Sequence, residues 1–266
     1  RGPQGGTIIM INGEVAAYET KTDQTLSNCV YPYWHPSGRY IAYSVNTTRQ
    51  MFPMSTDKRI EVYDEASDIV VFDNNTKRLI SSKLLTTNKF ETFPAFSSDG
   101  KYLYFCVSDQ KKMPDEYQEV RYALCRIAFH PESGTFGSVM DTLINAPAMG
   151  KSLTFPRPSP DGRFLMFTMA DYGTFPIWHS EADLGLLNLQ TGEWHLMDGI
   201  NSSETESYHS WSSNSRWIVF SSRRDDGLYT RPFIACIDEQ GRTGKPFLLP
   251  QKKPATYYSN LLYSFN

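Results

Sequence analysis

The chain of 266 residues repeats one phrase four times, and this repetition constrains its fold more than any other feature. Successive copies begin 62, 62 and 53 residues apart. They read YPYWHPSGRYIAY from Tyr31, FPAFSSDGKYLYF from Phe93, FPRPSPDGRFLMF from Phe155 and YHSWSSNSRWIVF from Tyr208. A period of this length is typical of solenoids, propellers and arrays, in which each repeat is one supersecondary unit.

Each copy has the pattern of a tight antiparallel hairpin. An aromatic residue opens an extended segment, a polar turn such as Pro160-Asp161-Gly162 follows, and then an apolar run such as Phe164–Phe167. Such a turn suits a hairpin, because proline presets φ, Asp bonds to the local backbone and Gly accepts a left-handed conformation. The run is apolar at successive positions and not only at alternate ones, which predicts a strand buried on both faces.

Two further strands are predicted in each repeat, after a longer polar segment. The third strands are Ile69–Phe72, Tyr122–Cys125, Leu184–Leu187 and Phe233–Cys236, and the fourth are Arg78–Ile80, Thr142–Ile144, Trp194–Leu196 and Phe247–Leu249. Four antiparallel strands per repeat are typical of the blade of a β-propeller. The sequence therefore predicts an all-β protein built as a propeller.

The two ends of the chain bear on the number of blades. Thr7–Ile11 and Glu14–Tyr18 flank Asn12-Gly13, a pattern that predicts a hairpin with a two-residue turn. This hairpin resembles the outer strands of a blade that lacks its inner strands. Tyr257–Phe265 fits either a strand that completes that blade or a helical turn. We predict one propeller domain over residues 1–266 with five blades, and six if a blade is missing from this chain.

Composition excludes some classes of partner. A net charge of −3 predicts no broad attraction to nucleic acid or to an anionic membrane. No stretch approaches the roughly 18–20 apolar residues that a membrane-spanning helix needs. The chain begins with Arg1 and shows no signal-peptide pattern, so we interpret it as a processed or trimmed piece.

The cysteines have no metal-ligand spacing and do not settle the cellular compartment. They are Cys29, Cys106, Cys125 and Cys236. Cys106 and Cys125 fall on neighbouring predicted strands of one blade. We interpret both as buried small side chains, and a disulfide between them is the alternative.

The repeated phrase resembles the repeat of TolB-like propellers, a WD-repeat-like family of bacterial envelope proteins. SSDGKYLYF and SPDGRFLMF match its consensus F-P-x-F-S-P-D-G-[KR]-x-[IL]-x-F closely, whereas the Tyr208 copy has His209 for the proline and Asn214-Ser215 for Asp-Gly. The resemblance implies a periplasmic or cell-surface protein that binds other proteins. Similar repeats also occur in propeller domains of prolyl-oligopeptidase-like peptidases and in oligogalacturonate lyases.

Loop lengths predict that one face of the propeller carries the function. In a propeller, the connections between second and third strands and between blades open on one face, here called the long-loop face. The remaining turns open on the opposite, short-turn face. The long segments 46–67, 109–121, 171–182 and 223–231 all fall on the long-loop face. Long loops on a rigid scaffold commonly carry binding sites.

These long segments are rich in the residue types that interface cores use. The candidate binding residues among them are Tyr117, Arg121, Trp178, His179, Arg223 and Arg224. We expect them to contact a protein partner; the alternative is that they fold back and pack their own loops. On the first hypothesis, charge reversal at Arg223 and Arg224, or Trp178→Ala, abolishes partner capture and leaves the fold intact.

A second hypothesis places a small ligand or a polysaccharide at the mouth of a central channel. Arg157 aligns in the repeat with Tyr33, Ala95 and Ser210, so on this hypothesis it points a cation toward the channel; the alternative is that a structural carboxylate holds it. His209 begins an inner strand, and His179 lies in a loop of the long-loop face. No nucleophile elbow, zinc-protease motif, phosphate loop or dinucleotide fingerprint occurs in the sequence. We therefore favour non-catalytic protein binding over a lyase-like activity, with no metal and no cofactor.

Overall fold

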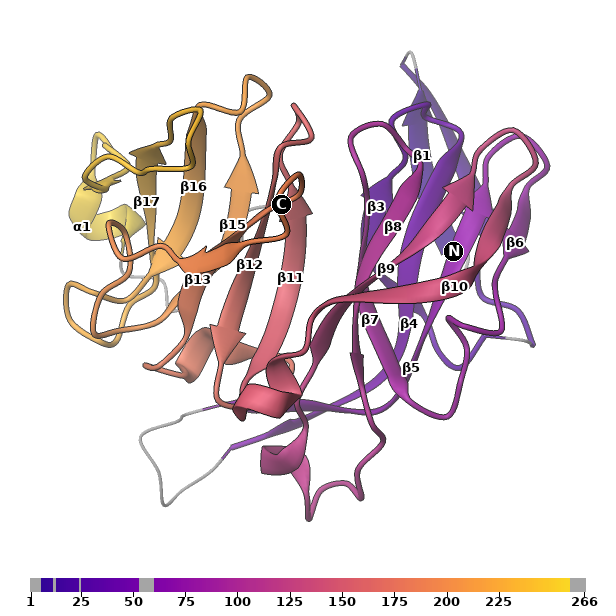
Figure 1. Cartoon of the computed structure of the whole chain (residues 1–266), viewed down its shortest axis with the longest axis horizontal. Coiled ribbons are helices and arrows are strands. Elements are labelled where there is room, and N and C mark those ends of the chain that lie inside the picture. The colour runs from indigo at the N-terminus through magenta and orange to yellow at the C-terminus, as the bar shows by residue number, and fades with distance from the viewer. Residues whose placement is uncertain (1–5, 12, 24, 53–59, 259–266) are drawn as a thin grey trace.

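The chain folds almost entirely into antiparallel strands. The computed structural model describes residues 6–11, 13–23, 25–52 and 60–258. The strands form upright sheets, with β1–β10 in one half of the molecule and β11–β18 in the other (Figure 1). The described helices are short: η1 (Tyr117–Glu119), η2 (Ala146–Met149), η3 (Pro176–Trp178) and α1 (Pro254–Tyr257). The predicted all-β class is confirmed.

Each repeated phrase begins one four-stranded sheet, and the strands of each sheet pair in chain order. The first sheet is β3 (Cys29–Trp34), β4 (Tyr40–Met51), β5 (Glu61–Asp73) and β6 (Arg78–Ile80), and the second is β7 (Phe90–Phe96), β8 (Tyr102–Ser108), β9 (Ala123–His130) and β10 (Thr135–Ile144). The third is β11 (Ser152–Pro158), β12 (Phe164–Ala170), β13 (Asp183–Asn188) and β14 (Trp194–Leu196), and the fourth is β15 (Glu206–Trp211), β16 (Trp217–Ser222), β17 (Arg231–Cys236) and β18 (Phe247–Leu248). One parallel residue pair, Ser67 with Phe90, links the first sheet to the second.

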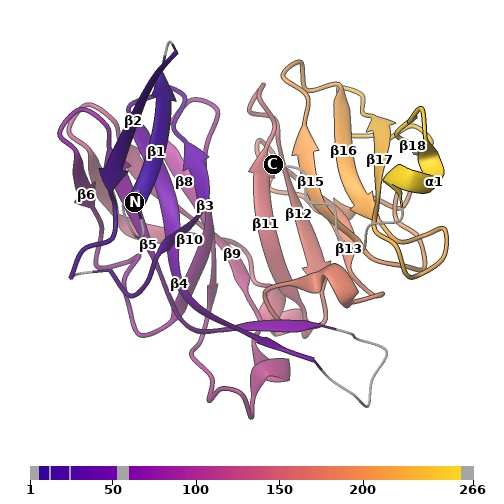
Figure 2. The same cartoon turned by 180° about the vertical axis from the view of Figure 1, so that it is seen from behind.

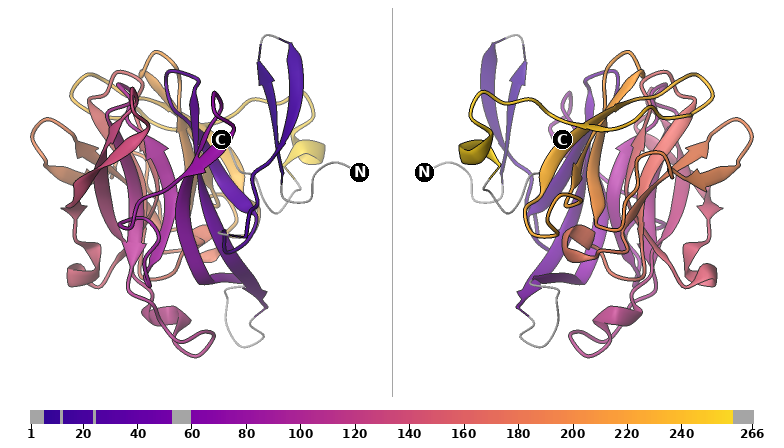
Figure 3. Two further views of the ribbon diagram at one scale, coloured as in Figure 1. Left: turned by 90° about the vertical axis from the view of Figure 1, so that its right-hand side faces the viewer. Right: turned by 90° about the vertical axis from the view of Figure 1, so that its left-hand side faces the viewer.

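The predicted N-terminal hairpin is present and stands beside the first sheet. β1 (Gly6–Ile11) pairs with β2 (Glu14–Glu19) in the register expected of the two-residue turn, and the hairpin projects from the body of the molecule (Figure 3). The Tyr18 ring packs 5.7 Å from the Phe72 ring. Most of the C-terminal segment 257–265, for which we predicted either a strand or a helical turn, lies outside the described residues. The described chain therefore gives four blade-like sheets and one hairpin, and a count of five or six blades stays a prediction.

The aromatic that opens each phrase is not in extended backbone, contrary to expectation. Tyr31, Phe93, Phe155 and Tyr208 have φ values of 52°, 54°, 54° and 45°. Each lies where the inner strand gains a residue over its neighbour, a β-bulge. The left-handed region costs a non-glycine residue roughly 1–2 kcal/mol, and packing of the rings offsets this cost.

These four rings pack on one another along the axis of the molecule. Consecutive ring centroids lie 4.7 Å (Tyr31 to Phe93), 4.3 Å (Phe93 to Phe155) and 4.9 Å (Phe155 to Tyr208) apart. Tyr31 also meets Phe155 edge-on at 6.3 Å. The axis, where a channel was predicted, is therefore filled with aromatic side chains at this level.

The short turns of neighbouring sheets interlock. His35, buried in the turn of the first sheet, contacts the Gly100 carbonyl oxygen of the second through Nε2 at 3.0 Å. Gly100 has φ +73°, and a Cβ there would lie 2.2 Å from His35 Nε2, so only glycine fits. In the same way, the Asp161 amide donates to Ser215 Oγ at 3.0 Å, from the third sheet to the fourth.

The segment 46–67 was predicted as a polar loop but forms mainly strand. β4 and β5 continue as a long hairpin that leaves the first sheet and passes beneath β11–β13 (Figure 2). Its pairs, such as Arg49 with Tyr63 and Gln50 with Val62, combine polar side chains with residues of high strand propensity. This hairpin carries first-sheet residues to the long-loop face of the third sheet.

Strand register separates the two cysteines that we considered as a disulfide. Cys106 lies opposite Leu124 and Cys125 lies opposite Phe105, so the two sulfurs point to opposite faces of the sheet. Both are free and buried. The interpretation as buried small side chains is confirmed, and the disulfide alternative is wrong.

Candidate functional site

Three of the six long-loop candidates lie inside the protein and not on its surface. Trp178, His179 and Arg223 are only 3%, 1% and 6% exposed. Pro176 begins η3, which turns this loop back toward the body, and the Arg223 guanidinium lies 3.7 Å from the Trp178 ring centroid. The alternative that these side chains fold back and pack their own loops is therefore the one the structure supports.

Arg224 is bound into a buried network of the fourth sheet. Its Nη2 donates to Glu206 Oε1 at 3.0 Å, and Glu206 is fully buried. Ser202 and Ser222 hydroxyls donate to the same carboxylate oxygen, each at 2.7 Å. Replacing Arg224 would leave a buried carboxylate without its cation, so we now expect charge reversal at Arg224 to destabilise the fold.

His179 joins two carboxylates across two sheets. Its Nε2 lies 3.2 Å from Glu61 Oε2 and its Nδ1 lies 3.1 Å from Glu181 Oε1. The Tyr172 hydroxyl donates to Glu61 Oε1 at 2.7 Å. Burial, and then the Glu61 carboxylate, raise the pKa of Tyr172. This acid–histidine–tyrosine cluster fastens the start of β5 to the 171–182 loop.

Sequence reasoning missed Glu61 because nothing in the sequence brings it near His179. Glu61 lies 118 residues before His179, inside the segment 46–67 that we expected to be loop. Only the long β4–β5 hairpin joins them. Glu181, two residues after His179 in the sequence, contacts the other ring nitrogen.

Tyrosine rings lead from this buried cluster to the surface. The half-buried Tyr117 ring of η1 lies 5.8 Å from the Tyr172 ring, and the Tyr63 ring of β5 lies 6.4 Å from that of Tyr117. Farther along the hairpin, Phe52 exposes 65% of its surface. Tyr117 is thus the candidate that borders both the buried cluster and the exposed arm.

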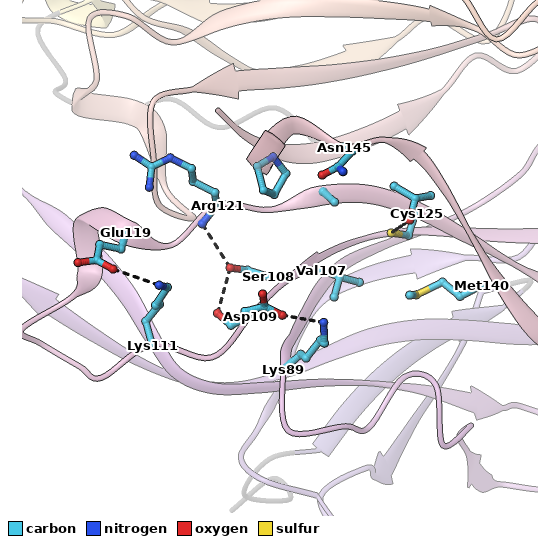
Figure 4. A pocket seen from close by; sticks show the side chains of 13 residues that line it. Lys89, Val107, Ser108, Asp109, Lys111, Glu119, Arg121, Cys125, Met140 and Asn145 are labelled. Carbon is cyan, nitrogen blue, oxygen red and sulfur yellow. Dashed lines mark hydrogen bonds and ion pairs between the residues drawn. The ribbon is translucent and has the colours of Figure 1, made fainter. Parts of the chain in front are cut away.

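Arg121 lines a cavity of about 400 Å³ at the long-loop end of the second sheet. Figure 4 shows two ion pairs on its wall, Lys89 with Asp109 at 2.6 Å and Lys111 with Glu119 at 3.0 Å. The Arg121 amide donates to Ser108 Oγ at 3.3 Å, and its side chain extends away from Ser108. The wall of the cavity therefore carries both positive and negative side chains, and Arg121 adds one positive charge beyond the two ion pairs.

The residues of the channel hypothesis do not converge on one site. Arg157 lies at the short-turn end of β11, where it lines a cavity together with Tyr33 and Ser210, two of the three residues with which it aligns in the repeat. Its guanidinium carbon lies 5.6 Å from the Tyr33 ring centroid, and burial lowers its pKa. His179, in contrast, belongs to the long-loop end.

His209 is buried between the third and fourth sheets and not at a channel mouth. It is 1% exposed, and its Nδ1 lies 3.5 Å from Thr168 Oγ1. Burial, with a smaller effect of nearby Arg157, lowers the pKa of His209 to about 3, so the ring is neutral at ordinary pH. Within the described parts of the chain, no three His, Cys, Asp or Glu side chains are grouped closely enough to hold a metal ion.

Comparison with known proteins identifies the fold. No family model matches the chain, and no curated protein matches its sequence. An oligogalacturonate lyase in complex with manganese is similar over 90% of this chain and 58% of its own, at 14% identity and a TM-score of 0.54. TolB from Acinetobacter baumannii is similar over 89% of this chain and 62% of its own, at 14% identity and a TM-score of 0.41. A putative TolB from Agrobacterium tumefaciens is similar over 84% of this chain and 81% of its own, at 16% identity and a TM-score of 0.47.

The likeness to the lyase shows the fold alone, and that fold is a β-propeller. It agrees with the TolB-like propeller that the repeated phrase predicted. The chain spans less than two thirds of the lyase and of the Acinetobacter TolB. Within the described residues, no helix has both the length and the apolar character needed to cross a membrane.

Proposed function

We propose that this chain is a non-catalytic, protein-binding β-propeller of the bacterial cell envelope that presents its long-loop face to a partner. The long β4–β5 hairpin, an arm that projects beneath the sheets and exposes Phe52, carries this proposal (Figure 1). The envelope location rests on the resemblance of the repeated phrase to TolB-like repeats.

The arm has the properties of an interface anchor on a rigid base. Phe52 is a large apolar side chain in water, and exposed aromatic side chains commonly supply the central contacts of interfaces. Arg49 and Tyr63 form a strand pair on the same hairpin, and the Tyr117 ring of η1 contacts the Tyr63 ring. The Glu61–Tyr172 and Glu61–His179 contacts hold the far end of the described hairpin, where Glu61 pairs with Met51, against the 171–182 loop. A partner therefore meets an arm that is already in place, which lowers the entropic cost of binding.

The test is capture of partners from an extract of the cells that make the protein, with Phe52→Ser against the parent chain. We expect Phe52→Ser to lose partners that the parent retains, since truncation of an interface anchor costs about 2 kcal/mol or more. Val139→Ser on β10 is the matched control, because Val139 is similarly exposed (67%, against 65% for Phe52) and lies on the second sheet. Identical partners from the parent, Phe52→Ser and Val139→Ser would contradict the proposal.

A further inference from the structure

The cavity at the long-loop end of the second sheet joins a charged end to an apolar one. Its volume of about 400 Å³ is within the usual range for small-molecule sites. Figure 4 shows Arg121, Lys111 and Glu119 toward one end of it, and Cys125 and Met140 toward the other. We propose that this cavity binds a small monocarboxylate that carries an aliphatic tail.

The charges that line the cavity favour an anion with one negative charge. Asp109 and Glu119 are paired with Lys89 and Lys111, so each of these acids already has its cation. Within the described chain, the one hydrogen bond of Arg121 comes from its backbone amide, and its side-chain Nε atom is buried without an acceptor. The lining therefore carries one positive charge in excess, which a ligand of charge −1 complements.

The charged end has the donors that a carboxylate needs. The planar fork of N–H groups in the Arg121 guanidinium matches the two oxygens of a carboxylate, with which a guanidinium can form two parallel hydrogen bonds. Lys111 is a second donor at this end, because an ammonium group has three N–H bonds and the contact with Glu119 uses one of them. Hydrogen bonds between charged groups are stronger than those between neutral ones. A carboxylate should therefore bind in preference to the neutral amide of the same shape.

One face of the second sheet forms the apolar floor of the cavity. Val107 of β8 lies opposite Ala123 of β9, and Cys125 of β9 lies opposite Thr142 of β10. Opposite residues share a face, and so do residues two positions apart on one strand, so these four side chains lie together. Val107 and Cys125 belong to a hydrophobic core cluster, which fixes the floor. No aromatic side chain of the described chain lines the cavity, and the flexible Met140 side chain can adapt to an aliphatic tail.

This cavity is distinct from the partner-binding arm, although both lie on the long-loop face. Residues of the second sheet and of its connections line the cavity, and Phe52 is not among them. The purified protein can therefore be tested for the carboxylate without any partner, and Phe52→Ser should bind it as the parent does. A negative result here would not bear on partner capture by the arm.

Hexanoate is the probe, with hexanamide as the neutral analogue and acetate as the acid without a tail. Calorimetry gives the three affinities. We expect hexanoate to bind at least about tenfold more tightly than hexanamide, because the amide loses a charge-assisted hydrogen bond. It should also bind at least about tenfold more tightly than acetate, because its tail buries several methylene groups. The proposal is overturned if either comparison ligand binds as tightly as hexanoate, or if hexanoate does not bind at about 10 mM.

Matched variants locate the site. Arg121→Gln should weaken hexanoate binding at least about tenfold, whereas Arg78→Gln removes the same charge from an exposed position outside the cavity and should change nothing. Met140→Ala changes a partly exposed side chain, so it tests the site even if Arg121→Gln fails to fold. It should weaken hexanoate binding at least about threefold. Met149→Ala should not, because Met149 is similarly exposed (47%, against 36% for Met140) and does not line the cavity. Unchanged hexanoate affinity in either Arg121→Gln or Met140→Ala overturns the proposal.

Discussion

At the scale of single residues, one position shows how the repeat has been altered. Three of the phrases place a proline after the left-handed aromatic, and the fourth places His209 there. In the second, third and fourth phrases this position is buried, and neither a proline nor a neutral histidine brings a charge into it. A histidine can still acquire one, and burial opposes this by lowering the pKa of His209 to about 3.

His209 should make the protein less stable as the pH falls. Its folded-state pKa of about 3 lies below the unfolded value of 6.5, so between these values only the unfolded chain takes up the proton. The free energy of unfolding should then fall by about 1.4 kcal/mol per pH unit from this group. Urea unfolding between about pH 6 and pH 4 should show a shallower decline for His209→Gln than for the parent. The exposed His195→Gln should decline like the parent, and equal slopes for all three chains would refute the assignment.

At the scale of strands and loops, sequence patterns found the sheets and missed the arm. The apolar runs and turns located every strand of the four repeats, since buried strands and tight turns leave local signals. The extension of β4 and β5 leaves no such signal, because its side chains are largely polar and its alternation is weak. For the same reason Glu61 could not be placed beside His179. Arg157, Tyr33 and Ser210 could be brought together from the repeat alone, because their register is part of the repetition.

The network around Glu206 provides a test at the level of one sheet. Arg224→Ala removes the cation that faces this buried carboxylate, which should lower the free energy of unfolding by roughly 3–5 kcal/mol. Arg242→Ala removes an exposed ion pair with Asp238 and should cost about 1 kcal/mol or less. Urea denaturation of both variants measures the difference. Equal costs would mean that Glu206 is not a buried partner of Arg224.

At the scale of the whole molecule, the four axial rings hold the sheets together. Phe155 contacts aromatic rings from the first, second and fourth sheets, so it is the central member of this cluster. No single sheet could bury these side chains alone.

Removal of this central ring should therefore weaken the entire assembly. Phe155→Ala should lower the free energy of unfolding by about 3–5 kcal/mol, the usual cost of deleting a buried phenylalanine side chain. Phe247→Ala, at an exposed position on β18, should cost well under half of that. Thermal and urea unfolding provide the comparison, and similar losses in the two variants would show that the axial cluster does not bind the sheets together.

The packed rings on the axis also separate the two ends of the propeller. Their centroids lie 4.3–4.9 Å apart, so aromatic side chains fill the space between the inner strands at this level. Thermodynamic linkage requires that two ligands bias a common element. Two molecules that bind at opposite ends of the propeller would therefore contact separate sets of side chains, which predicts that occupancy of one end leaves the affinity of the other unchanged.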